Sequence, residues 1–156
     1  MMESALIETS GLTKTYGGIR AVDALDVRIT EGEVYGFLGP NGAGKSTTLL
    51  MLLGLIQPSG GSARVCGLDP TREAGRIKQR VGFLPENVGF YGDLTAEESL
   101  AYIAELNGLR REEAAVKVRE ALETVGLPAD ETGGKRVGTF SRGMKQRLGI
   151  AEVLVK

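Results

Sequence analysis

The sequence contains no histidine and no tryptophan, and its 156 residues include a single cysteine. One cysteine cannot form a disulfide within the chain, and a Cys/His zinc site is excluded without histidine. Basic and acidic residues nearly cancel, at 19 against 20, so no global field attracts nucleic acid or an anionic membrane. Any phosphate site must therefore be local. The composition favours a reducing cytoplasm, and no nucleic-acid partner is expected.

Long apolar runs are also missing. The longest, Leu49–Leu53, is far shorter than the roughly 20 residues that cross a bilayer. Met1–Ser10 lacks the basic stretch and apolar core of a secretory signal. With 156 residues and 42% hydrophobic composition, the chain is long enough for one domain with its own core. We expect a soluble chain that reaches a membrane only through a partner.

Hydrophobic periodicity predicts strands in the first half of the chain. Leu25, Val27 and Ile29 alternate with polar residues, which is typical of a half-buried strand. The continuous apolar stretches Val34–Leu38 and Val81–Leu84 predict strands that are buried on both faces. Between these stretches the pattern predicts a helix, a short strand and a surface helix, at Thr47–Ile56, Ala63–Cys66 and Thr71–Gln79.

The second half of the chain has a helical pattern. Thr95 and Glu98 have the spacing of a capping box, which marks a helix start and the boundary of a helical part. Pro128–Gly138 is polar and contains glycine, so a loop is expected there. The predicted helices are Ala96–Asn107, Arg111–Val125, and a last helix after Ser141 with Met144, Leu148, Ala151 and Val155 on one face.

Gly39–Ser46 has two glycines that bracket four residues, followed by lysine and serine, between a predicted strand and a predicted helix. Glycines let the backbone curl around an anion, and the helix adds the positive end of its dipole. We expect Lys45 to reach the outer phosphates, Ser46 to bind Mg²⁺ and Thr47 to bond the innermost phosphate. The alternative is a surface loop that matches by chance. The residues expected to hold a nucleotide here are Gly39, Asn41, Gly42, Gly44, Lys45, Ser46 and Thr47.

A second motif, Phe140–Arg147, opens the last predicted helix with Ser141 and Gly143. The free N–H groups of a helix start can meet a terminal phosphate. A serine before an amphipathic helix is also a common N-cap, and the residues alone leave both interpretations open.

Together these motifs make the chain resemble the nucleotide-binding domain of ATP-binding cassette (ABC) transporters over essentially its whole length. In this resemblance Gly39–Ser46 is the Walker A loop and Phe140–Arg147 is the signature motif, with Arg142 and Met144 in place of a glycine and a glutamine. Tyr16 falls where the family stacks an aromatic ring on adenine. An aromatic residue at such a position also commonly packs on the domain surface.

Glu86 lies where most members carry a glutamine that contacts Mg²⁺ and the attacking water. The resemblance therefore implies that Glu86 is catalytic and that Glu86 and Ser46 bind the metal, because a carboxylate can hold Mg²⁺ directly or through water. The alternative for Glu86 is a solvated loop carboxylate. Glutamate at this position, with the altered signature motif, resembles the branch whose membrane partners are ABC-2 type permeases, mainly exporters.

The fold that the resemblance implies is an α/β P-loop NTPase. A RecA-like core with an N-terminal antiparallel β-subdomain would occupy residues 1–87, and a helical subdomain with the signature motif residues 88–156. The implied partners are a second nucleotide-binding subunit, as a homodimer, and permease subunits at the cytoplasmic face of the cell membrane, contacting Asn87–Asp93. Phe90 and Tyr91 within that segment have an equal alternative, which is to fill the core of the helical part.

In the family, the signature helix leads into the Walker B strand, whose acidic residues orient Mg²⁺ and water. Ile150–Lys156 ends before such a strand, so part of the core sheet is missing, and no histidine is available as the switch residue. We expect ATP binding with negligible hydrolysis by this chain, and a fragment of a longer ATPase is the favoured explanation. A non-catalytic interaction module is one alternative. A small P-loop kinase is another, disfavoured by the lack of an evident acceptor site.

Overall fold

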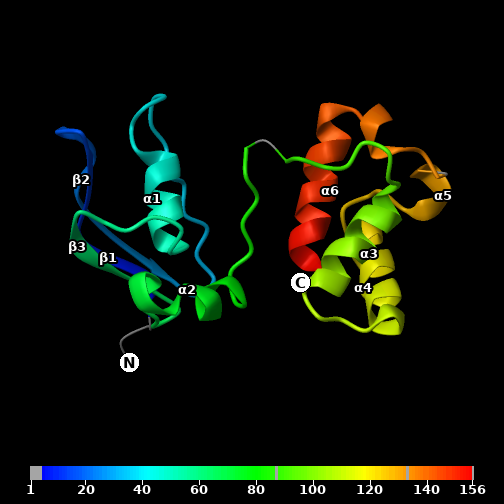
Figure 1. The fold of residues 1–156 in the computed structure, drawn as a ribbon, viewed down its shortest axis with the longest axis horizontal. Helices are drawn as coiled ribbons and strands as arrows, with labels where there is room; N and C mark the ends of the chain where they lie inside the picture. The colour runs from blue at the N-terminus through cyan, green and yellow to red at the C-terminus, as the bar shows by residue number, and fades with distance from the viewer. Residues whose placement is uncertain (1–4, 87, 133, 156) are drawn as a thin grey trace. The chain divides into compact units, whose positions relative to one another are not determined.

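The computed structural model describes residues 5–86, 88–132 and 134–155. The chain divides into two compact parts, which we call unit 1 (Met1–Val81) and unit 2 (Gly82–Lys156). Figure 1 shows a sheet with two helices in unit 1 and a set of helices in unit 2. Each unit is described by itself. The sequence-based assignment of residues 1–87 and 88–156 to two subdomains stays a prediction.

Unit 1 is built on a three-stranded antiparallel sheet in the order β2-β1-β3. Glycine at positions 17 and 18 allows the tight turn between the first two strands, because both residues have positive φ angles, of 52° and 85°. The strands are β1 (Ala5–Tyr16), β2 (Ile19–Thr30) and β3 (Gly60–Val65), and the helices are α1 (Lys45–Leu52) and α2 (Pro70–Lys78). The alternating strand predicted around Val27 and the short strand before Cys66 are therefore confirmed.

The first helix ends earlier than the apolar pattern predicts. The backbone N–H groups of Gly54 and Leu55 donate to the carbonyls of Met51 and Leu50, which closes α1 with a glycine of positive φ, 66°. A Cβ atom at Gly54 would lie 2.3 Å from the carbonyl oxygen of Pro70. The chain therefore needs glycine here, both for the turn and for the approach to α2.

The buried strand predicted at Val34–Leu38 is wrong. The segment forms no strand, and Val34 and Leu38 are 100% and 91% exposed. Tyr35 and Phe37, at the alternate positions, line an apolar cavity between the sheet and α1. The backbone is thus two-sided, as a strand would be. Within the described residues no neighbouring strand pairs with it, and a continuous apolar run alone supplies no hydrogen-bonding partner.

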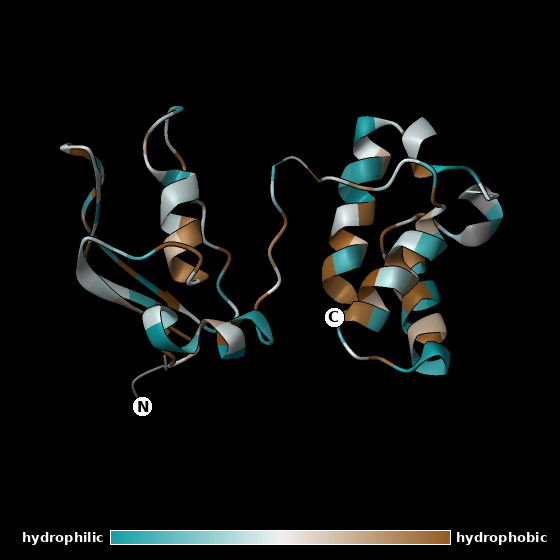
Figure 2. Cartoon of the chain, in the orientation of Figure 1, coloured by the Kyte–Doolittle hydropathy of each residue, from teal (hydrophilic) through white to brown (hydrophobic). Residues whose placement is uncertain are grey.

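Unit 2 consists of helices around one apolar core. The capping box is confirmed, because Thr95 Oγ1 accepts from the N–H of Glu98 at 3.1 Å, and the Glu98 carboxylate accepts from the N–H of Thr95 at 2.8 Å. Figure 2 shows that α6 changes from a hydrophilic first half to a mostly apolar second half. The elements are α3 (Ala96–Leu106), α4 (Arg111–Thr124), α5 (Ala129–Thr132), the 3-10 turn η1 (Val137–Thr139) and α6 (Arg142–Leu154).

The predicted face of the last helix forms much of this core. Leu148, Ala151 and Val155 are fully buried and pack with residues of α3 and α4, among them Leu100 and Leu122. The loop expected between residues 128 and 138 is only partly correct, because α5 and η1 lie within it. Single helical turns of this length are stabilised by their surroundings and leave no periodic signal in the sequence.

The strand predicted at Val81–Leu84 is also wrong, and the segment from Gly82 to Val88 instead packs along α6 as irregular chain. A Cβ atom at Gly82 would lie 2.0 Å from Cγ1 of Val153. Further along α6, a Cβ atom at Gly149 would lie 2.5 Å from Cδ1 of Leu84. The glycines therefore allow a close approach, and side-chain packing rather than a ladder of hydrogen bonds holds the segment.

Candidate functional site

The loop from Gly39 to Gly44 bends over the start of α1. Gly42 and Gly44 both have left-handed backbones, with φ of 84° and 83°, and the N–H of Ala43 donates to the carbonyl of Pro40 at 3.2 Å. Such alternation of backbone conformation turns successive N–H groups toward one side, which makes an anion-binding concavity. Asn41 lies exposed in the same loop.

Lys45, the first residue of α1, folds back across this loop. Its Nζ donates to the carbonyl oxygens of Gly39 and Pro40, at 2.7 and 2.8 Å. The ammonium group therefore lies over the concavity, where a phosphate would meet it. A phosphate oxygen can replace either carbonyl as the acceptor, and the charge-assisted bond is the stronger one.

The start of α1 has free capacity for an anion. Among the residues that the structure describes, no side chain caps this end of the helix and no acidic residue lies in its first turn. Ser46 is exposed there and Thr47 is half-buried, while the buried Thr48 donates to the carbonyl of Gly44 at 3.0 Å. The hydroxyl of Ser46 is thus available to a metal ion held by phosphate oxygens, which is the coordination that Mg²⁺ prefers.

Tyr16 lies at the end of β1, beside the same loop. Its strand pairs with β2 through Tyr16 and Ile19, and a Cβ atom at Gly44 would meet the carbonyl oxygen of Ala21 at 2.2 Å. The hairpin end and the phosphate loop are therefore in contact within unit 1. The ring of Tyr16 is 50% exposed, and Nζ of Lys14 lies 5.0 Å from its centroid. Unit 1 thus brings the predicted aromatic residue together with the glycine loop.

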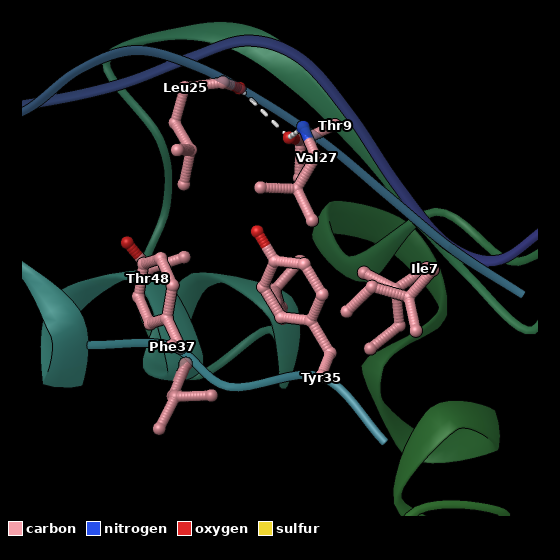
Figure 3. Close-up of a pocket in the computed structure, with 10 residues that line it drawn as sticks. Ile7, Thr9, Leu25, Val27, Tyr35, Phe37 and Thr48 are labelled. Carbon is pink, nitrogen blue, oxygen red and sulfur yellow. Dashed lines mark hydrogen bonds between the residues drawn. The ribbon is translucent and has the colours of Figure 1, made fainter. Parts of the chain in front are cut away.

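The apolar cavity beneath the sheet is a different feature. It has a volume of about 230 Å³. Figure 3 shows Tyr35 and Phe37 on one side of it and Val27 on the other. Its upper edge carries a hydrogen bond from Thr9 Oγ1 to the carbonyl of Leu25, at 2.8 Å. Hydrocarbon surface of this kind cannot compensate the charge of a triphosphate, so the nucleotide belongs at the loop.

Unit 2 carries the other predicted residues. Ser141 is the N-cap of α6, and its Oγ accepts from the N–H of Met144 at 3.2 Å. The N-cap interpretation is therefore realised, while the hydroxyl proton of Ser141 stays available as a donor. Gly143 is open, since a Cβ atom there would meet no atom within 4 Å among the described residues.

Glu86 is exposed at the edge of a hollow of about 330 Å³ beside the start of α6. The hollow is lined by Glu86, Val88, Phe140, Arg142, Lys145 and Gln146. Arg142 and Lys145 are one helical turn apart on α6, so two cations border the same space as the carboxylate. In unit 2 the structure thus places Glu86 near the signature motif.

The predicted permease segment is split between core and surface. Phe90 packs against the apolar core of unit 2, as one alternative expected. Tyr91 is 68% exposed and meets the ring of Tyr102 edge-on, with centroids 6.2 Å apart. Asn87 lies outside the described residues. Only part of this aromatic pair therefore serves the core.

Sequence reasoning missed Lys14, Lys145 and the packing of Ala21 against the glycine loop. Lys14 has a readable signal, because residues two apart on a strand point to the same face. Lys145 follows Arg142 by three residues, which predicts a shared helix face. The contact of Ala21 joins distant parts of the chain and has no local signal. Among the described residues, no three Asp, Glu, Cys or His side chains gather to hold a metal, and no helix is long and apolar enough for a bilayer.

Comparison with known proteins agrees with this geometry. The sheet, the glycine loop and the helix that follows define unit 1 as part of a P-loop NTPase fold. The family model for the ABC transporter matches residues 22–156, so the chain belongs to the ABC transporter family. This membership confirms the resemblance and removes the small P-loop kinase as an alternative.

Two curated relatives are both named as ATP-binding proteins. The bacitracin transport ATP-binding protein BcrA of Bacillus licheniformis is 45% identical over 97% of this chain and 48% of its own length. The daunorubicin/doxorubicin resistance ATP-binding protein DrrA of Streptomyces peucetius is 42% identical over 96% of this chain and 44% of its own. The chain therefore spans about half the length of these relatives.

A solved structure shows the same fold. The cbiO1 protein from Clostridium perfringens, titled as part of the ABC transporter complex cbiONQ, has a TM-score of 0.83 and 27% identity, over 98% of this chain and 62% of that one. The fold class expected from the sequence, a P-loop NTPase, is thereby confirmed.

Proposed function

We propose that this chain is the nucleotide-binding part of the ATP-binding subunit of an ABC exporter. One observation carries the proposal: Lys45 Nζ lies across the carbonyls of Gly39 and Pro40, at an uncapped and non-acidic start of α1. This arrangement combines a mobile cation, backbone donors and a helix dipole at one point, which is how proteins hold phosphates. The half-exposed ring of Tyr16 beside the loop supplies a surface for adenine.

Roles for the remaining residues follow. Gly39, Asn41, Gly42 and Gly44 form the loop around the phosphates, Thr47 bonds the innermost one, and Ser46 holds Mg²⁺. In a dimer of two such subunits, Ser141 and Gly143 of one copy contact the terminal phosphate of the nucleotide bound to the other. Glu86 takes the role of the water- and metal-contacting residue, and its exposed carboxylate agrees with that role.

The proposed membrane partner is a permease of the ABC-2 type, which places the subunit at the cytoplasmic face of the membrane. Support comes from the exposed ring of Tyr91 in the segment assigned to permease contact. The names of the two relatives, one for bacitracin transport and one for drug resistance, favour export over import. Dimer closure on ATP would then move the permease.

Within these 156 residues we propose binding without turnover. Phosphoryl transfer requires a positioned water and a stabilised metal, and Glu86 alone does not replace both acidic residues of a Walker B strand. The chain as given is therefore expected to retain nucleotide after binding it.

The test is direct binding of ATP with Mg²⁺ to the 156-residue chain, measured by isothermal titration calorimetry. Lys45→Met removes the charge-assisted bonds to phosphate, so we expect affinity to fall at least about tenfold. Lys117→Met, on the exposed side of α4, removes the same charge elsewhere and should leave affinity unchanged. Equal affinity in the wild-type chain and Lys45→Met would overturn the proposal.

A further inference from the structure

The ring of Tyr16 has two faces, and one of them is occupied. Nζ of Lys14 lies 5.0 Å from the centroid of the ring, within the roughly 6 Å of a cation–π contact. Lys14 and Tyr16 are two residues apart on β1 and therefore point to the same side of the sheet. The ammonium group covers the near face of the ring, and the ring is still 50% exposed.

Lys14 is itself anchored. Its Nζ donates to the carbonyl of Gln57 at 2.6 Å, in the segment that follows α1. The same segment holds the backbone of the strand end, because the N–H of Thr15 donates to Ser59 Oγ at 3.0 Å and the N–H of Ser59 donates to the carbonyl of Thr13 at 2.8 Å. Both the cation and the strand under the ring are thus fixed from one side.

The position of this assembly relative to the phosphate loop is also defined. Lys14 pairs with Val22 in the strand register, and Cγ2 of Val22 would lie 2.9 Å from a Cβ atom at Gly44. The strand pair that carries Lys14 and Tyr16 is therefore the one against which the loop packs. A base stacked on the ring and a phosphate in the loop would be held by neighbouring parts of unit 1.

We infer that Lys14 is a positioning residue for nucleotide: it occupies one face of Tyr16, fixes the ring, and leaves the other face for the base. The inference rests on the proposed function, since it concerns the same nucleotide. A ring already held in place loses less rotational freedom on stacking, which strengthens binding without a new contact to the ligand. Lys14 should therefore strengthen the base contribution to affinity and leave the phosphate contribution alone.

The experiment compares ATP with inorganic tripolyphosphate, each with Mg²⁺, as ligands of the 156-residue chain in calorimetry. Lys14→Met should weaken ATP binding about threefold, the size expected of an exposed cation–π contact, and leave tripolyphosphate unchanged. Lys14→Arg should restore ATP affinity, because guanidinium also lies over aromatic rings. Arg20→Met, which removes a charge from the same hairpin, is the matched control and should bind both ligands normally.

Tyr16→Ala separates this inference from the proposed function. It should weaken ATP about tenfold, the value of one stacked base, and leave tripolyphosphate unchanged. If Tyr16→Ala weakens ATP and Lys14→Met does not, the inference is overturned and the proposed function stands. If the chain and Lys45→Met bind ATP alike, the proposed function fails.

A measurement without ligand tests the contact itself. In the free chain, the ring of Tyr16 should shift the ε-methylene proton resonances of Lys14 upfield, and Tyr16→Leu should abolish the shift. An unshifted resonance in a folded wild-type chain would overturn the inference whatever the binding data show.

Discussion

Gly44 packs directly on Ala21, so closely that a Cβ atom at Gly44 would lie 2.2 Å from the carbonyl oxygen of Ala21. Gly44 also has a φ of 83°, which side chains rarely adopt. We predict that Gly44→Ala destabilises the chain by about 2–4 kcal/mol and displaces the loop, because a left-handed alanine and a backbone clash add together. Urea denaturation followed by circular dichroism measures the loss.

Gly42→Ala is the matched comparison. Its φ of 84° is almost the same, but a Cβ atom there would meet no described atom within 4 Å. We expect a loss of only about 1 kcal/mol, from the backbone alone. Equal losses in the two variants would show that the contact with Ala21 does not fix the loop.

The core of unit 2 depends on Leu148, which is fully buried on α6. Leu148→Ala removes this packing and leaves a cavity, so we predict a loss of about 3 kcal/mol in the free energy of unfolding. Val116→Ala, at a side chain that is 58% exposed on α4, should change stability by less than about 0.5 kcal/mol. Differential scanning calorimetry of the two variants distinguishes core from surface, and similar melting points would contradict the assigned core.

Asp69 makes the start of α2 sensitive to acid. The hydroxyl and the backbone N–H of Thr71 donate to its carboxylate, at 2.7 and 2.8 Å, and these bonds lower the pKa of Asp69. A lowered pKa stabilises the folded state above the unfolded pKa of about 3.9, and the stabilisation is lost as pH falls through the folded value. Asp69→Asn keeps an N-cap but should remove this component of acid unfolding.

The measurement is the dependence of the melting temperature on pH between about 2 and 6, spanning the carboxylate range. We expect the curve of Asp69→Asn to be flatter at the acid end than that of the wild-type chain. Superimposable curves would mean that the hydrogen bonds from Thr71 do not stabilise the folded state.

The 156-residue chain should not turn over ATP at a measurable rate. We expect phosphate release by the purified chain with Mg²⁺ and ATP to equal that of Lys45→Ala, because neither sample positions a water against a stabilised metal. A coupled phosphate assay over hours makes the comparison. Sustained release that disappears in Lys45→Ala would refute the prediction.

The sequence predicted what is encoded locally. The capping box at Thr95 and the alternation around Val27 depend on neighbours in the chain, so both are found where the pattern indicates. The glycine loop was recognisable because the motif itself determines its backbone.

Features that depend on distant partners were not predictable in this way. Val34–Leu38 has the apolar run of a buried strand, but no described strand pairs with it. The close approach of Gly149 to Leu84 joins residues far apart in the chain, as does the contact of Gly44 with Ala21. A glycine that permits a turn and a glycine that admits another segment look alike in a sequence.

The packing of Gly82 on Val153 and of Leu84 on Gly149 has a mechanical consequence for the proposed function. Glu86 follows these contacts directly, and Ser141 begins the same helix that receives them. A displacement of Glu86 toward metal or water therefore pulls on the helix that addresses the opposite nucleotide. A bulkier residue at either glycine would disconnect this transmission while leaving every residue that touches a nucleotide in place.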